Sequence, residues 1–195
     1  MTPEPIPEGD LAAIVECGLF APSAGNRQPW HFLVVTNRDL ILKIAAAVAA
    51  RVAAIMATMS SDRARKSFGD YNLFMTFFKN SSALILAYVE PYPGLLERLL
   101  ARYAPDVAAP AGQTAAGQSV AAAIQNILLA AHGRGYAGCW NTGALIAKSE
   151  IGELVGVQEG RDLVGLVGLG HRDPSKPVPP APARRPVAET VTYLK

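Results

Sequence analysis

Cysteine is scarce in this sequence. Its 195 residues include only two, Cys17 and Cys139. The N-terminal stretch MTPEPIPEGD is acidic and proline-rich, whereas a secretory signal peptide begins with a basic segment followed by an apolar one. Two free thiols without a recognisable signal peptide indicate a reducing compartment. We therefore expect a soluble, cytoplasmic protein.

Charge is also scarce, since Asp, Glu, Lys and Arg make up 17% of the chain and the formal net charge is only +2. This charge is too small to indicate binding of nucleic acid, and no basic stripe with interleaved aromatic residues is present. The longest uncharged stretch, residues 107–133, contains several hydroxyl and amide side chains and is too polar for a membrane span. We expect neither a nucleic-acid nor a membrane partner. Low charge in an alanine-rich chain is consistent with surface covered in an oligomer.

Several motifs of catalytic and metal sites are missing. The chain has no G-x-S-x-G, H-E-x-x-H or C-x-x-C motif, and its three histidines lack the spacing of metal ligands. GRGYAG at 133–138 matches G-x-G-x-x-G, but it follows a helix instead of a strand, so we interpret it as a helix C-cap and turn. We predict no metal site and no catalytic side chain.

The apolar pattern predicts several helices and few strands, and no repeat or linker divides the chain. We therefore expect one domain over residues 1–195, of the α+β class. Strands are predicted at 32–36, 82–89 and 162–170. Helices are predicted at 11–20, from 37 or 39 to 56, within 91–103, through 120–131 and at 150–156. The remaining segments are a polar loop or short helix at 60–72, a small-residue stretch at 109–117, a turn at 136–143 and a last strand or arm at 188–194.

The stretch APSAGNRQPWHF, residues 21–32, concentrates hydrogen-bonding groups at one helix-to-strand junction. Ser23, Asn26 and Gln28 can donate and accept hydrogen bonds, and their small neighbours let the backbone approach a flat ligand. Pro29 and Trp30 would fix this loop to the core. The groups suit the edge of a heterocycle such as the pyrimidine ring of a flavin. The alternative is an ordinary polar loop with local capping bonds.

APSAGNRQPWHFLVV closely resembles the signature of the nitroreductase family of FMN-dependent oxidoreductases. The segments IQNILLAAHGRGYAGCWNTGALIAKSEIGELVGV and LVGLVGLGHRDP, and the tail ARRPVAETV, are similar to the family's central helix, flavin-side turn, last strand and basic tail. The resemblance implies a three-layer sandwich with a central, mainly antiparallel sheet flanked by helices. It also implies an intertwined homodimer with FMN at the interface.

The resemblance assigns cofactor-binding residues by position. The flavin ring would contact the loop residues Pro22, Ser23, Ala24, Asn26 and Gln28. Along the other side of the flavin would lie Trp140, Asn141, Thr142 and Gly143, with one backbone N–H donating toward N5. Arg184 and Arg185 would bind the FMN phosphate, which the planar guanidinium group suits; the alternative is a solvated basic tail.

The implied activity is an FMN-dependent oxidoreductase. NAD(P)H would reduce the flavin by hydride transfer, and a nitroaromatic, quinone or similar flat small-molecule acceptor would reoxidise it in a ping-pong cycle. The alternative is a non-catalytic dimeric protein that binds or sequesters flavin.

The sequence departs from the family at its N-terminus. Members usually carry an Arg-Arg-Ser-x-Arg segment before the position of PEPIPEGDL, whereas only Met1 and Thr2 precede it here. Three explanations stay open: a start assigned too late, compensation, or loss of FMN. Compensation would come from Arg184 and Arg185 or from Arg63, Arg65 and Lys66. The intact PSAGN and WNTG groups favour a start assigned too late or compensation over loss of FMN.

Overall fold

The structure is a computed structural model that describes residues 1–107, 115–178, 180 and 182–194. Most of the small-residue stretch expected at 109–117 lies outside the described residues. The strands are β1 (Trp30–Val35), β2 (Ala83–Val89), β3 (Ala137–Asn141) and β4 (Asp162–Gly170). The helices are α1 (Glu8–Leu19), α2 (Arg38–Thr58), α3 (Asp62–Met75), α4 (Leu95–Tyr103), α5 (Ala115–Gly133), α6 (Lys148–Val155) and α7 (Val187–Thr190), with short 3-10 turns η1 (Ala24–Asn26), η2 (Phe77–Asn80) and η3 (Gly143–Ala147).

The four strands form one antiparallel sheet in the order β1-β2-β4-β3. Every residue of β2 is buried, as expected for a central strand covered on both faces. The strands β1 and β3 are the two edges of this sheet. This order matters for the site, because the loop at 21–29 leads into one edge and the WNTG segment ends the other.

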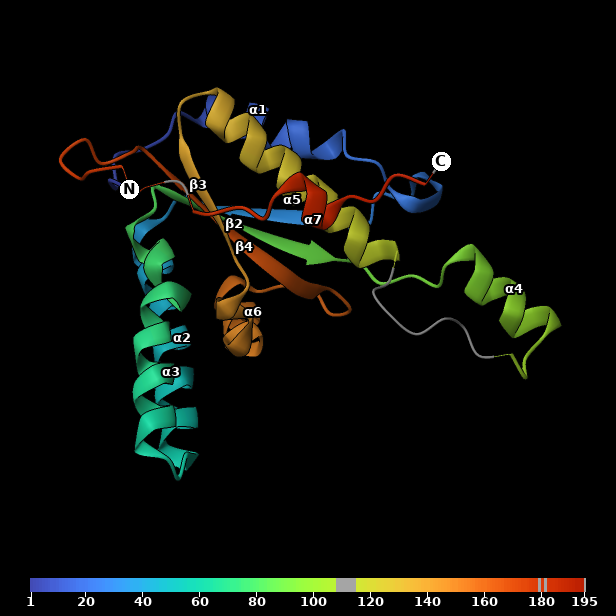
Figure 1. The fold of residues 1–195 in the computed structure, drawn as a ribbon, viewed down its shortest axis with the longest axis horizontal. Helices are drawn as coiled ribbons and strands as arrows, with labels where there is room; N and C mark the ends of the chain where they lie inside the picture. Colours follow the sequence, from blue (N-terminus) through green and yellow to red (C-terminus); the bar gives the residue numbers. More distant parts are fainter. Residues whose placement is uncertain (108–114, 179, 181, 195) are drawn as a thin grey trace.

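Helices cover both faces of the sheet and give three layers (Figure 1). On one face α5 packs against β2 and β4, α1 packs against α5, and Ile14, Ile124 and Ile127 belong to the core of that face. On the other face α2 and α6 contribute Ile44, Val48 and Ile151. The predicted α+β fold with an antiparallel sheet between helices is therefore confirmed.

Two glycines of β4 allow side chains to lie directly on the strand. A Cβ atom added at Gly165 would lie 2.3 Å from Nε1 of Trp140, and one at Gly168 would lie 2.5 Å from Oγ of Ser81. The absence of a side chain at 165 thus leaves room for the Trp140 indole ring against β4. The glycines of β4 therefore permit close packing against the strand.

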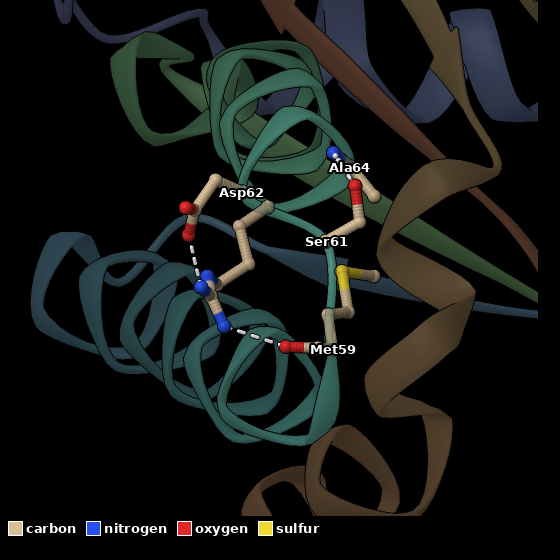
Figure 2. A network of polar contacts seen from close by, with 5 residues as sticks. Met59, Ser61, Asp62 and Ala64 are labelled. Carbon is tan, nitrogen blue, oxygen red and sulfur yellow. Dashed lines mark hydrogen bonds and ion pairs between the residues drawn. The ribbon is translucent and has the colours of Figure 1, made fainter.

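Residues 60–72, expected as a loop or short helix, belong mostly to the 14-residue helix α3. Ser61 caps its start, because its hydroxyl accepts a hydrogen bond from the Ala64 N–H at 3.3 Å. Arg65 donates to the Met59 carbonyl at 2.5 Å and pairs with Asp62, which holds the turn between α2 and α3 (Figure 2). The polarity of this segment reflects an exposed helix, not a loop.

Three other segments refine the expectations. Residues 137–141 form strand β3 where we predicted only a turn, and the GRGYAG turn is confirmed by Gly135 at φ 83° just after α5. The C-terminal segment holds the four-residue helix α7 followed by extended backbone at Val191.

Helix α2 is long and apolar enough to cross a membrane by length and composition, but its buried side packs in the core against α3 and α6.

We predict that Gly165→Ala destabilises the protein by about 1–3 kcal/mol, because the added methyl group displaces the packed Trp140 ring. Urea unfolding followed by circular dichroism measures the change. Gly9→Ala is the matched control, since no atom lies within 4 Å of the new methyl group in α1. Equal unfolding free energies for the two variants would contradict the prediction.

Candidate functional site

The loop at 21–29 holds an uncommon backbone conformation. Gly25, Asn26 and Gln28 have φ angles of 61°, 51° and 50°, in the left-handed region that side chains other than glycine rarely adopt. Ser23 Oγ accepts the Gln28 backbone N–H at 3.0 Å, and Asn26 Oδ1 accepts a hydrogen bond from Gln28 Nε2 at 3.3 Å. These local bonds stabilise a strained conformation, a feature concentrated at ligand-binding sites.

The same loop is anchored from behind. The Ala24 N–H donates to Ser119 Oγ of α5 at 3.3 Å, and the Ala24 carbonyl accepts from the Tyr92 hydroxyl at 3.1 Å. Pro29 is buried, and its carbonyl accepts the Glu90 N–H at 2.8 Å. Pro22, Asn26 and Gln28 remain exposed. Asn26 is exposed, and among the hydrogen bonds of the described residues none uses its amide nitrogen, so this donor is available to a ligand.

The WNTG segment begins in β3 and ends in η3. Asn141 is only 5% exposed, and its carboxamide is fully engaged. Its Nδ2 donates to the carbonyls of Phe74 at 2.8 Å and Met75 at 3.1 Å, and its Oδ1 accepts the Ala144 N–H at 3.0 Å. A ligand would therefore meet Asn141 through its backbone. Thr142 is exposed, and the N–H groups that begin a helix such as η3 lack partners within it.

A pocket of about 360 Å³ opens beside this segment. It is lined by Tyr71, Phe74, Met75, Phe77, Cys139, Trp140, Asn141, Thr142 and Gly143. The lining therefore includes all four residues that the family resemblance placed along one side of the flavin, Trp140, Asn141, Thr142 and Gly143. The aromatic residues of the lining from α3 and η2 were not identified as site residues from the sequence. Their spacing of three, at 71, 74 and 77, was the pattern in the sequence that could have placed them on one side of a helical segment.

The two predicted groups of ligand-facing residues do not share a pocket in one chain. Residues of the 21–29 loop do not line the pocket beside β3. The loop leads into β1, and the WNTG segment ends β3, so β2 and β4 lie between them. Three strand spacings of about 4.8 Å put the two edges roughly 14 Å apart.

The candidate phosphate-binding residues lie in exposed segments. Arg184 donates to the Pro182 carbonyl at 3.3 Å, and Arg185 donates to the Glu189 carbonyl at 3.0 Å beside the Glu189 carboxylate. Of the other proposed substitutes, Arg65 is held in the turn before α3 and Lys66 pairs with Asp70 at 3.3 Å, while Arg63 is exposed. The assignment of Arg184 and Arg185 to the phosphate group therefore stays a prediction.

A separate polar hollow of about 400 Å³ lies along α6. Its cations are already paired, because Lys148 contacts Asp162 and Arg161 contacts Glu90, each at 2.7 Å. The buried hydroxyl of Tyr88, which lines it, has no hydrogen-bond partner among the described residues, and burial raises the pKa of this phenol. The balanced charges indicate no defined ionic ligand here.

Comparison with known proteins places this geometry in context. The model of the nitroreductase family matches residues 1–171. A protein of Archaeoglobus fulgidus, provisionally named NADH dehydrogenase/NAD(P)H nitroreductase, is 28% identical over 170 residues, which span 85% of this chain and 74% of that protein.

Solved structures agree in fold. A BluB-like flavoprotein of Clostridium difficile superposes with a TM-score of 0.85 at 26% identity, over 98% of this chain and 91% of that one. A nitroreductase of Bacteroides fragilis with bound FMN gives a TM-score of 0.70 at 24% identity, over 99% of this chain and 90% of that one. The family match over most of the length leads to one conclusion: the chain belongs to the nitroreductase family.

Proposed function

We propose that the protein is an FMN-dependent oxidoreductase that uses NAD(P)H to reduce flat acceptors such as nitroaromatics or quinones. The observation that carries this proposal is the aromatic pocket against the backbone of Thr142 and Gly143, the segment that the family resemblance assigns to the flavin. The FMN bound in the Bacteroides fragilis relative and the name of the Archaeoglobus fulgidus relative support the choice of cofactor and reductant.

The residues present fit FMN in chemical character. The loop offers an amide donor on Asn26 and an amide oxygen on Gln28, beside the exposed residues Pro22 and Ala24, and this donor and acceptor suit the alternating groups of a flavin edge. The start of η3 offers backbone N–H groups. Arg184 and Arg185 carry the charge that a phosphate group needs, and both are exposed.

When bound, FMN supplies two-electron chemistry, in which NAD(P)H and one proton convert a quinone to a hydroquinone, or a nitro group to a nitroso group and water. The loop residues would hold the polar edge of the ring. A backbone N–H of Thr142 or Gly143 would donate toward N5 and stabilise negative charge there. The aromatic side chains of the pocket would orient the acceptor and exclude water. No side chain needs to act as acid or base.

The separation of the two groups by the sheet supports an intertwined homodimer. We propose that one FMN contacts the 21–29 loop of one copy of the chain and the WNTG segment of another. The edge strand β1 leaves Val34 41% exposed beside an apolar groove of about 640 Å³ along α1. The C-terminal segment carries Tyr193 and Leu194, the latter 94% exposed. We propose that this segment covers the groove of the partner.

The proposal treats residues 1–195 as one FMN-binding domain that works in the cytoplasm with a small-molecule acceptor, and with neither a nucleic-acid nor a membrane partner. The low net charge supports the expectation of no nucleic-acid partner, and the buried side of α2 supports the expectation of no membrane partner.

The test of the proposed function is a visible spectrum of the purified homodimer after addition of FMN. We expect a flavin absorbance band that NADPH bleaches under anaerobic conditions and that a quinone restores. Bound FMN that NADPH does not bleach would favour the sequestering alternative. Protein that cannot bind FMN would overturn both.

Arg185→Ala should weaken FMN binding at least tenfold, equivalent to about 1.4 kcal/mol, because a charge-assisted phosphate contact is lost. Fluorescence titration measures the affinity. Glu189→Ala is an informative control, since it frees the Arg185 side chain and should leave FMN affinity equal or higher. Unchanged affinity in Arg185→Ala would reject this residue as a phosphate ligand.

Asn26→Ala should weaken FMN binding while the protein stays dimeric, because the side chain is exposed and bonds only within its own loop. Affinity and sedimentation velocity are measured on the same preparation. Asn80→Ala, at an exposed position in η2, is the control. Dissociation of the dimer in Asn26→Ala would instead assign Asn26 a structural role.

A further inference from the structure

We propose that the pocket between α3 and β3 is selective for uncharged flat rings, and that Tyr71 and Phe74 determine this selectivity. The inference rests on the proposed function and names the acceptor class of its site. It is carried by the exposure of these aromatic residues, by the charge of the lining and by the hydrogen bonds that hold the two walls together.

The outer wall of the pocket consists of aromatic side chains that the fold itself does not need. Phe74 is 68% exposed and Tyr71 is 52% exposed, although both adjoin the pocket. Their ring centroids lie 5.9 Å apart with planes 34° from parallel. Exposed aromatic rings gathered at the mouth of a pocket provide stacking surface for a flat ligand.

The lining of this pocket carries no ionic charge. None of its nine residues is Asp, Glu, Lys, Arg or His. The neighbouring charges on α3, Lys66 and Asp70, pair with each other at 3.3 Å. The Cys139 residue is exposed as a whole, but desolvation of its sulfur raises the pKa of the thiol, which is therefore neutral at pH 7. A charged ligand would lose hydration here without gaining a side chain of opposite charge.

The relative position of the two walls is fixed by Asn141. Its amide group donates to the carbonyls of Phe74 and Met75 at the end of α3, and its oxygen accepts the Ala144 N–H in η3. A carboxamide with three hydrogen bonds in a buried position permits little movement. The aromatic wall and the Thr142–Gly143 backbone therefore form one rigid slot.

The charge preference is tested with a matched pair of probes, 4-nitrobenzamide and 4-nitrobenzoate, which differ mainly in charge. We expect the NADPH-dependent reaction of the FMN-loaded enzyme to show a kcat/KM at least tenfold higher for the amide. Equal values, or a preference for the carboxylate, would overturn the inference.

The role of the aromatic wall is tested with Phe74→Ala and Tyr71→Ala. We expect each variant to raise KM for 4-nitrobenzamide at least fivefold with kcat changed less than twofold. Leu73→Ala is the matched control, because Leu73 is 69% exposed on the same helix but does not line the pocket. Unchanged KM in both aromatic variants, or a loss of dimer without a change in KM, would overturn the inference.

A second readout does not depend on catalysis. Nitroaromatic rings quench tryptophan fluorescence on contact, and Trp140 lines the pocket. We expect 4-nitrobenzamide to quench a Trp30→Phe variant with saturation, and Phe74→Ala introduced into that variant to weaken the quenching at least fivefold. Quenching without NADPH oxidation would refute the proposed function alone; activity without saturable quenching would refute the pocket alone.

Discussion

A single buried carboxamide determines the geometry of the candidate site. Asn141 ends strand β3, and its side chain joins the last carbonyls of α3 to the start of η3. Without it, two carbonyls and one N–H would lose their partners in a place where water has poor access. Leaving such a group unsatisfied costs about 1–3 kcal/mol. The pocket therefore depends on an internal hydrogen-bond network and not only on apolar packing.

The sheet explains why the two candidate segments lie apart. An antiparallel sheet of four strands has two edges, and the polar loop before β1 and the WNTG segment of β3 lie at opposite ones. Each edge leaves backbone groups without partners in the sheet, which favours coverage by another chain. Dimer formation and cofactor binding would then be linked, because each FMN would stabilise the contact between two copies. Affinity for FMN would consequently rise with protein concentration.

Much of the fold was predictable from local pattern. The strand expected at 82–89 is continuously apolar from Ala83 to Val89, and the central helix has a regular apolar stripe. Strand β3 was missed because its residues, AGCWN, are small and mixed, and it depends on the pairing of Cys139 with Gly168 across the sheet. Helix α3 was underestimated because its exposed side is polar. For the candidate site, motifs in the sequence pointed to the 21–29 loop and the WNTG segment. The spacing of three at 71, 74 and 77 places these aromatic residues on one side of a helical segment, but it does not show that this side adjoins β3, which depends on tertiary packing. The assigned cofactor contacts themselves stay predictions.

The contact between Trp140 and Gly165 has a consequence for how this protein can diverge. The indole ring occupies the space that any side chain at 165 would require. The two positions are thus energetically coupled, and their substitutions should not be additive. A smaller residue at 140 would have to precede, or accompany, a larger one at 165. Homologues that differ at one position should therefore differ at the other, which makes the pair a marker for subgroups with a reshaped slot.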